Sequence, residues 1–373
     1  MDKGYSGAIM KILNIVNLFL LIVHFLSISF LESVSEVIKK RVKDDFSIEE
    51  NRIRSYFCPP EMGNLPVSDW KNPTLNDYMV IQNHLRARLE KLVANPDSEK
   101  CFEEQLEGWI RYRIGRVQLI DIKNNHVPEF KIIYINNNPL KKDKCVICYG
   151  SYNNAGRDYI QGINCIIKAL RASNFDGHFI YRIGGWPSLA NGRLKYADVP
   201  YAFKPFFFEE VRDLGYKQIL WLDSASVPVK NLDPIFRSIK EHGCCFFGEW
   251  AIAPQKIEWL NYVIRALRIP RKSQYLDIVS QVVGFDLENK KASLLLDRWI
   301  QAAIQKVPFL APAGDQDSFM FLVHDLDLLH GKLPQHYYQH GKPLDFSVLP
   351  RTVILHNYDF LNPEANVPES LFR

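Results

Sequence analysis

The stretch LGYKQILWLDSASVPVKNLDPIF, residues 214–236, starts as an apolar strand and becomes polar at once. Residues 218–222 contain four large apolar side chains in a row, which is typical of a strand buried on both faces. The run is followed by a carboxylate and two hydroxyls, with one alanine between them: Asp223, Ser224, Ala225 and Ser226. Polar groups directly after a buried strand predict a ligand site at the edge of a sheet.

Strands and helices alternate on both sides of this stretch. Short apolar runs predict strands at 130–135, 144–150, 177–184, 244–250, 281–287 and 352–360. Helical spacing of apolar residues predicts helices at 159–173, 201–215, 290–305 and 315–326. Gly215 is the expected stop of the second of these helices. The alternation predicts an α/β domain over residues 130–373, with a mainly parallel sheet and helices on both faces.

The residues before this domain differ in composition. Residues 41–129 predict an α-rich extension, with one helix over 74–95 and a second over 96–114 that has Asp97 or Ser98 as its cap. The first 40 residues contain the apolar run ILNIVNLFLLIVHFLSISFL, residues 12–31, which is long enough to span a bilayer. A spanning helix, an interfacial helix, an uncleaved signal sequence and a buried helix of the fold all fit this run. We expect a membrane-associated chain with a single N-terminal helix or signal-anchor, on an undecided side of the membrane.

The composition excludes several classes of protein. Of 373 residues, 47% are hydrophobic, which is enough for a sizeable core. The net charge of +4 is too small to indicate a nucleic-acid partner. The seven cysteines are too sparse for a disulfide scaffold, and CVIC at 145–148 lies in a predicted strand, which favours buried thiols over a metal or redox site. GxGxxG, P-loop, GxSxG and HExxH motifs do not occur in the sequence.

The order of the elements resembles nucleotide-sugar glycosyltransferases of the GT-A fold, in a layout similar to glycogenin and bacterial galactosyltransferases. The resemblance is most specific over residues 200–236, which give helix, strand, acidic turn and short helix. It continues through QVVGFDLENKKASLLLDRW, GDQDSF and a late strand that ends in His356, and covers about residues 143–360. It implies a GT-A-like domain that moves a sugar from a nucleoside-diphosphate sugar to an acceptor.

In that superfamily an Asp-x-Asp motif at the strand end holds a divalent metal against the donor diphosphate. The leaving diphosphate gathers negative charge, so a cation or fixed positive groups must stabilise it. Asp223 matches the first acid, but Ala225 stands in the place of the second, so the motif is degenerate and dependence on Mn²⁺ or Mg²⁺ is in doubt. The resemblance implies that His356 joins Asp223 as a metal ligand; an ordinary strand-end histidine is the alternative.

Two cationic side chains are candidates for binding the diphosphate. Lys204 precedes Pro205, which biases Lys204 off the helix and places it beside a helix N-terminus. An ammonium at a helix start favours an anion, whereas a surface lysine that covers aromatic neighbours is the alternative. Arg182, just before GGW, is the second candidate.

Acidic residues near the end of the domain are candidates for binding the sugar. GDQDSF, residues 314–319, carries two acids where one N-cap suffices. The resemblance implies that Gln316 and Asp317 bind sugar hydroxyls or act as a base, with Asp315 beside them. Glu249, at the end of CCFFGE, is another strand-end acid, for which exposure to solvent is the alternative.

The first strand of the domain ends in YGSYNNAGRDY, residues 149–159, which would lie over the nucleotide. Gly150 permits close backbone approach, and Ser151 and Tyr152 offer a hydroxyl and a stacking ring. Ser224 and Ser226 could offer weak, neutral oxygens to the donor.

Together these residues predict a glycosyltransferase in which Asp223, Gln316 and Asp317 are catalytic. Its partners would be a nucleotide-sugar donor, a glycan, lipid or protein acceptor, and a membrane through residues 12–31, with no nucleic acid. An inactive nucleotide- or glycan-binding relic of the GT-A fold is the main alternative, because the second acid is missing. A nucleotidyltransferase is a further alternative, although the turn after the first strand is only faintly Gly-rich and basic.

Overall fold

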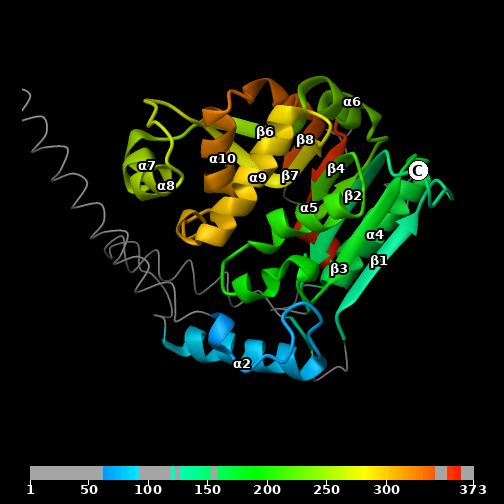
Figure 1. Cartoon of the computed structure of the whole chain (residues 1–373). Coiled ribbons are helices and arrows are strands. Elements are labelled where there is room, and N and C mark those ends of the chain that lie inside the picture. The colour runs from blue at the N-terminus through cyan, green and yellow to red at the C-terminus, as the bar shows by residue number, and fades with distance from the viewer. Residues whose placement is uncertain (1–61, 92–118, 122–126, 153–157, 341–350, 363–373) are drawn as a thin grey trace, which may run out of the picture. The chain divides into compact units, whose positions relative to one another are not determined.

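A mixed sheet forms the centre of the fold. The computed structural model describes residues 62–91, 119–121, 127–152, 158–340 and 351–362, all in the unit formed by residues 56–373. Within these residues the main sheet has six strands in the order β1-β3-β2-β4-β7-β6 (Figure 1). The strands are β1 (Glu129–Tyr134), β2 (Lys144–Gly150), β3 (His178–Ile183), β4 (Gln218–Leu222), β6 (Cys244–Ala251) and β7 (Leu276–Asp286).

The sheet is mixed, so the prediction of a mainly parallel sheet is wrong. Only β2 pairs in parallel, with β3 on one side and β4 on the other. The outer pairs β1–β3, β4–β7 and β6–β7 are antiparallel. The alternation of strand and helix gave no sign of this, because the direction of a strand depends on long-range pairing rather than on its own residues.

Helices cover both faces of the sheet, as the sequence predicted. One face carries α4 (Tyr159–Ala172) and α6 (Asp233–His242), and the other carries α5 (Phe203–Asp213), α9 (Lys290–Gln305) and α10 (Asp315–Asp325). The α5 helix is followed by Gly215 at φ 89°, the left-handed conformation that glycine adopts without strain. Two short helices, α7 (Pro254–Trp259) and α8 (Asn261–Ala266), lie between β6 and β7 in the sequence.

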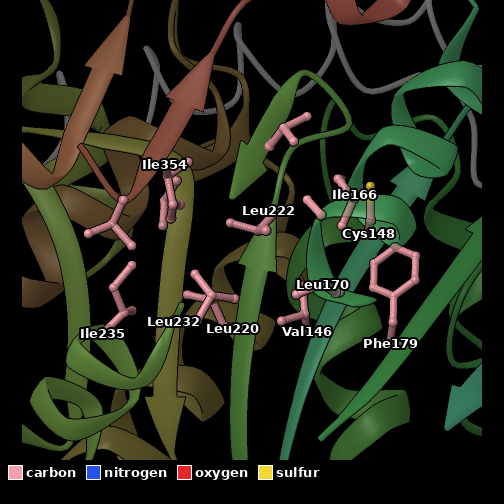
Figure 2. Close-up of a cluster of buried hydrophobic side chains, with 14 of the residues drawn as sticks. Val146, Cys148, Ile166, Leu170, Phe179, Leu220, Leu222, Leu232, Ile235 and Ile354 are labelled. Carbon is pink, nitrogen blue, oxygen red and sulfur yellow. The ribbon is translucent and has the colours of Figure 1, made fainter. Parts of the chain in front are cut away.

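Strand alternation divides the core between the two faces. Leu220 and Leu222 of β4 pack with the apolar side of α4 and with Ile235 of α6, as Figure 2 shows. Trp221 points to the opposite face, where its ring packs against Phe208 of α5. The CVIC cysteines lie in β2, where both thiols are buried and burial raises the pKa of each. The prediction of buried thiols is therefore confirmed.

A second, smaller sheet joins the end of the chain to the stretch after β4. It has the order β5-β9-β8, formed by β5 (Ser226–Pro228), β9 (Ile354–His356) and β8 (Tyr338–His340). Ser226 pairs with His356 in the antiparallel register of β5 and β9. The residues just after the central strand therefore lie beside the late histidine, although 130 positions separate them in the sequence.

The helix predicted over 74–95 is present as α2 (Leu75–Lys91). It is tied to the body of the domain by Gln82, whose side-chain oxygen accepts a 2.8 Å hydrogen bond from the Leu119 amide, and by Arg88, which lies 3.7 Å from Asp198. The apolar run at residues 12–31 and the second predicted helix, over 96–114, lie outside the described residues. None of the helices in the described ranges is long and apolar enough to cross a membrane.

Candidate functional site

A cavity of about 230 Å³ opens beyond the carboxyl ends of the parallel strands β2 and β4. It is lined by residues that follow these strands, by the first turns of α5 and α10, and by the end of β9. Sequence candidates that line it are Ser151, Lys204, Asp223, Ser224, Asp315, Gln316 and His356. Residues from five separate segments therefore share one cavity.

The Asp223 carboxylate is held at the mouth of this cavity by its own strand. The indole Nε1 of Trp221, two residues earlier, donates a 2.6 Å hydrogen bond to Asp223 Oδ1. The Asp223 amide donates to the Gln281 carbonyl of β7 at 2.9 Å, which fixes the backbone at the strand end. The side chain is 31% exposed, so one part of the carboxylate is anchored while the rest is open to a ligand.

The turn that carries Asp223 packs tightly on α4. A Cβ atom at Gly162 of α4 would lie 2.3 Å from the Ser224 carbonyl oxygen, closer than any side chain tolerates. Glycine is therefore required at this position for the turn and the helix to approach each other. This close packing fixes the height of the Asp223 turn above the sheet.

Lys204 forms the floor of the cavity. Its side chain is 3% exposed, and its Nζ lies 2.7 Å from Asp315 Oδ2 and 3.5 Å from Asp223 Oδ1. Nζ also donates to the Ser280 carbonyl at 2.9 Å and lies 5.1 Å from the Trp221 ring centroid. Burial acts to lower the pKa of Lys204, but the carboxylates of Asp223 and Asp315 outweigh it and raise this pKa above its ordinary value.

The backbone of Lys204 corrects the sequence interpretation. Pro205 was expected to keep Lys204 off the helix, yet α5 begins at Phe203 and Lys204 lies in its first turn. Proline is tolerated here because the first amides of a helix have no intrahelical acceptor to lose. The expected position beside a helix N-terminus is present, but the alternative of a surface lysine is excluded by its burial.

The α10 helix presents its first turn to the same cavity. Asp315 is 3% exposed and faces Lys204, and Gln316 lines the cavity beside it. Asp317 is fully buried and lies outside the cavity lining, with its Oδ2 accepting a 2.7 Å hydrogen bond from the Ala313 amide. The structure therefore places Asp315 and Gln316 at the cavity, whereas Asp317, the third residue of α10, bonds back to the amide before the N-cap Gly314.

His356 is joined to the turn after β4. Its Nδ1 lies 2.7 Å from the Ser226 hydroxyl, and its ring stacks on the ring of His340 with centroids 5.0 Å apart. Ser226 is fully buried and outside the cavity lining, whereas Ser224 lines the cavity. Ser226 therefore orients the histidine rather than meeting a ligand directly.

The donor set around Asp223 does not fit a resident divalent cation. Within the described residues no group of three or more histidine, cysteine, aspartate or glutamate side chains is arranged to hold a metal ion. One Asp223 oxygen is taken by the Trp221 indole and faces the Lys204 ammonium, while Ala225 supplies no ligand. Hard cations need several oxygen ligands, and a neighbouring ammonium opposes their binding.

Aromatic side chains also line the cavity, next to Lys204, and are called here its aromatic wall. Tyr149 and Phe203 stack with ring centroids 4.4 Å apart, and Tyr159, Tyr201 and Tyr358 also line the cavity. Burial raises the pKa of the Tyr149 phenol well above its usual range, so this ring stays neutral. The cavity therefore has a charged floor and an aromatic wall.

Besides Asp317 and Ser226, three further sequence candidates lie outside the cavity lining. Arg182 makes a two-pronged ion pair with Glu210 of α5, at 2.5 and 2.7 Å. The Tyr152 hydroxyl donates to the Val127 carbonyl, and its ring is buried. Gly150 packs against Tyr159, where an added Cβ would lie 3.0 Å from the Tyr159 Cβ. These three residues therefore make packing and ion-pair contacts within the domain.

Sequence reasoning missed the aromatic residues of the site and also Trp221, Ser280 and Gln281. Trp221 had a usable signal, because residues two apart in a strand share a face and its indole therefore lies on the side of Asp223. Ser280 and Gln281 had none, because they lie within β7 and resemble ordinary strand residues. They reach the cavity because β7 runs antiparallel to β4, which brings the first half of β7 to the carboxyl end of β4.

Comparisons with known proteins give weak similarities in structure. No protein-family model matches the chain, and no curated protein matches it in sequence. The bifunctional glycosyltransferase WbbM is similar with a TM-score of 0.37 and 13% identity, over 63% of this chain and 52% of WbbM. Mouse xyloside xylosyltransferase 1 is similar with a TM-score of 0.37 and 13% identity, over 61% of this chain and 100% of that protein. Similarity at this level assigns neither site nor activity to this chain.

Proposed function

We propose that the chain is a GT-A-like glycosyltransferase that moves a sugar from a nucleoside-diphosphate sugar to an acceptor. The observation that carries the proposal is the position of Asp223, which leaves a buried strand and opens into a cavity beside Lys204, Asp315 and Gln316. Ligands of open α/β sheets bind beyond the carboxyl ends of parallel strands, where this cavity lies. The order of elements in the sequence supports the same class.

The two sides of the cavity match the two halves of such a donor. The aromatic wall of Tyr149, Phe203 and Tyr201 suits a planar base, which binds by stacking. The first turns of α5 and α10 line the cavity, and the positive end of a helix dipole favours phosphate oxygens. The base would therefore lie on the aromatic wall, with the diphosphate between the two helix starts.

The charged floor suits the transferred sugar. Carboxylates accept hydrogen bonds from hydroxyls, so Asp223 and Asp315 would hold the sugar, with Gln316 beside them. Lys204 holds the two carboxylates in place, and its ammonium offsets part of the negative charge that gathers on the leaving diphosphate. In this proposal the positive ends of the α5 and α10 helix dipoles stabilise the leaving group, Lys204 keeps the net charge of the carboxylate cluster to that of one carboxylate, and no step depends on a metal.

Thermal-shift measurements with UDP, GDP, ADP and CDP test the proposal, because a ligand of the native state raises the melting temperature. We expect one of these nucleotides to stabilise the chain, with equal effect in EDTA and in Mn²⁺. The corresponding nucleotide-sugars should release nucleoside diphosphate, and Asp223→Asn should lower this release at least about 100-fold.

Asp213→Asn is the matched control. Asp213 is half-exposed at the end of α5, so this change should leave release at the wild-type rate. Absence of any nucleotide shift in the wild-type chain would contradict the proposal. Release that persists at the wild-type rate in Asp223→Asn would remove Asp223 from the site.

A binding protein without turnover is the second candidate function. It is favoured by Ala225, which is 2% exposed and stands where a second acid of the metal-binding motif would be. Such a relic would show the same nucleotide shift but no release of nucleoside diphosphate from any nucleotide-sugar. The two measurements together therefore separate the two candidates.

A further inference from the structure

The edge strand β6 ends in an exposed segment with an unusual composition. Glu249, Trp250 and Ala251 are exposed, whereas the five residues before them are buried. Trp250 is 78% exposed, the highest value among the described tryptophans. Tryptophan is enriched at binding surfaces, where its rigid ring supplies a large contact area.

A β-bulge aims this segment outward. Gly248 pairs with Ile278 and Ala251 pairs with Leu276, so Glu249 and Trp250 both lie opposite the single residue Asp277. A bulge leaves the extra residue unpaired and turns the side chains of the bulged strand. The bulge therefore explains why two neighbouring side chains are both exposed, where a regular strand would bury one of them.

This segment adjoins the cavity through Asp277. Gln316, which lines the cavity, places its side-chain amide 3.4 Å from Asp277 Oδ1. Adjacent strands lie about 5 Å apart, so Trp250 is one strand away from a residue that contacts the cavity lining. Trp250 is therefore linked to the lining of the candidate donor site through Asp277 and Gln316.

The short helix α7 adds a second exposed indole on the same side. Lys256 of α7 lies 3.6 Å from Asp277 and 3.5 Å from Asp317, which ties α7 to the rim. Trp259 follows Lys256 by three residues, on the same helix face, and is 54% exposed. Both indoles therefore lie on segments that adjoin Asp277: Trp250 on the strand opposite it, and Trp259 one turn after Lys256, which contacts it.

We infer that Trp250, Trp259, Glu249 and Asp277 form the subsite for a saccharide acceptor, an inference that rests on the proposed glycosyltransferase function. A pyranose ring has an apolar C–H face and a polar rim. The apolar face stacks on an indole, and the hydroxyls at the rim donate to carboxylates. A membrane surface fits less well, because Glu249 and Asp277 would meet the anionic headgroups that attract peripheral proteins.

Tryptophan fluorescence of the full chain tests this inference, with cellohexaose, maltohexaose, xylohexaose and chitohexaose as probes. We expect at least one of the four to change the emission and saturate. Trp250→Ala should weaken that binding at least tenfold and Trp259→Ala about threefold. Tyr134→Ala is the matched control, since Tyr134 is a 41% exposed aromatic residue on the opposite edge strand β1, and it should keep the wild-type affinity.

Three outcomes would overturn the inference: no response to any of the four saccharides, equal affinity in Trp250→Ala and the wild type, or equal losses in Trp250→Ala and Tyr134→Ala. Vesicles of phosphatidylcholine and phosphatidylglycerol form a separate arm. A Trp250-dependent blue shift with vesicles and none with saccharides would also overturn it. Failure of the proposed function is distinguishable, because it appears as the absence of any nucleoside-diphosphate shift in the wild-type chain.

Discussion

Lys204 in the cavity and Asp198 beside α2 are both buried ions, yet they are balanced in opposite ways. At Lys204 one cation faces two carboxylates, those of Asp315 at 2.7 Å and Asp223 at 3.5 Å. The second of these carboxylates, that of Asp223, is accessible to a ligand, because its side chain is 31% exposed and lines the cavity. This cluster therefore keeps one negative charge, that of the Asp223 carboxylate, available to a ligand.

At Asp198 one carboxylate faces two cations and is 1% exposed. Lys306 Nζ lies 3.0 Å from Asp198 Oδ2, and Arg88 of α2 donates to the Asp198 carbonyl at 3.0 Å. No cavity that the structure describes is lined by these three residues. Burial of a charge is therefore not by itself the mark of a site; the opening toward a ligand distinguishes the two clusters.

Lys204→Met should have the largest effect of any change in this comparison. Removing a buried cation leaves Asp315 without its partner in an apolar setting, which costs about 3–5 kcal/mol of unfolding free energy. Urea unfolding measures this loss, and nucleotide binding should be lost with it. Lys306→Met is the matched control and should cost less, because Asp198 keeps Arg88.

The double variant Lys204→Met with Asp315→Asn sharpens the result. The amide of asparagine carries no charge, so it should recover part of the stability that Lys204→Met loses. A double variant less stable than Lys204→Met alone would show that the ion pair is not the source of the loss.

Asp198→Asn should have the second-largest effect, and on stability alone. It leaves Lys306 and Arg88 without a charged partner, which costs about 1–3 kcal/mol. Nucleotide binding in thermal-shift measurements should match the wild type, since this cluster is closed. Loss of nucleotide binding at a temperature where the variant is folded would contradict the distinction between the two clusters.

Local sequence pattern predicted the part of the site that sits at element ends. The apolar strand followed by Asp223, and the acids of GDQDSF at a helix start, are signals contained within a few residues. The structure brings Asp223, Lys204, Asp315 and His356 to one cavity, as the order of elements suggested. Their chemical roles stay predictions.

Pairing between distant segments determined the features of the site that the sequence did not predict. A parallel arrangement would have placed Ser280 and Gln281 away from the carboxyl end of β4, but antiparallel pairing brings them beside Asp223. Arg182 lay at a strand end like Asp223, yet Glu210 on a different element neutralises it. Which charges pair with each other depends on packing between distant segments, and one chain does not reveal it.

Trp221→Phe should have an intermediate effect on nucleotide affinity. It tests whether the Trp221 indole keeps the Asp223 carboxylate in position for the ligand. Phenylalanine keeps the ring packing but removes the indole N–H that donates to Asp223. Water can partly replace this bond because the carboxylate is 31% exposed, so we expect nucleotide affinity to fall about tenfold, or about 1.4 kcal/mol. Trp186→Phe, another fully buried indole, is the control and should keep the wild-type affinity.

His324→Gln should have the smallest effect on stability. It compares a buried neutral side chain with the charged clusters at Lys204 and Asp198. His324 is 5% exposed, and its Nε2 accepts a 2.8 Å hydrogen bond from the Leu276 amide. Burial, with the Lys272 ammonium adding to it, lowers the pKa of His324 below 6.5. Below pH 6.5 the unfolded chain therefore binds a proton that the folded chain refuses, and stability falls as the pH falls.

Glutamine offers the same acceptor to Leu276 without titrating, so the variant should lose less stability than the wild type between pH 7.5 and pH 5. The difference amounts to about 1.4 kcal/mol for each unit by which the pKa is lowered. Urea unfolding across this pH range measures it. If the variant lost more stability than the wild type, the folded protein would favour the protonated histidine, and burial would not be the dominant influence on this side chain.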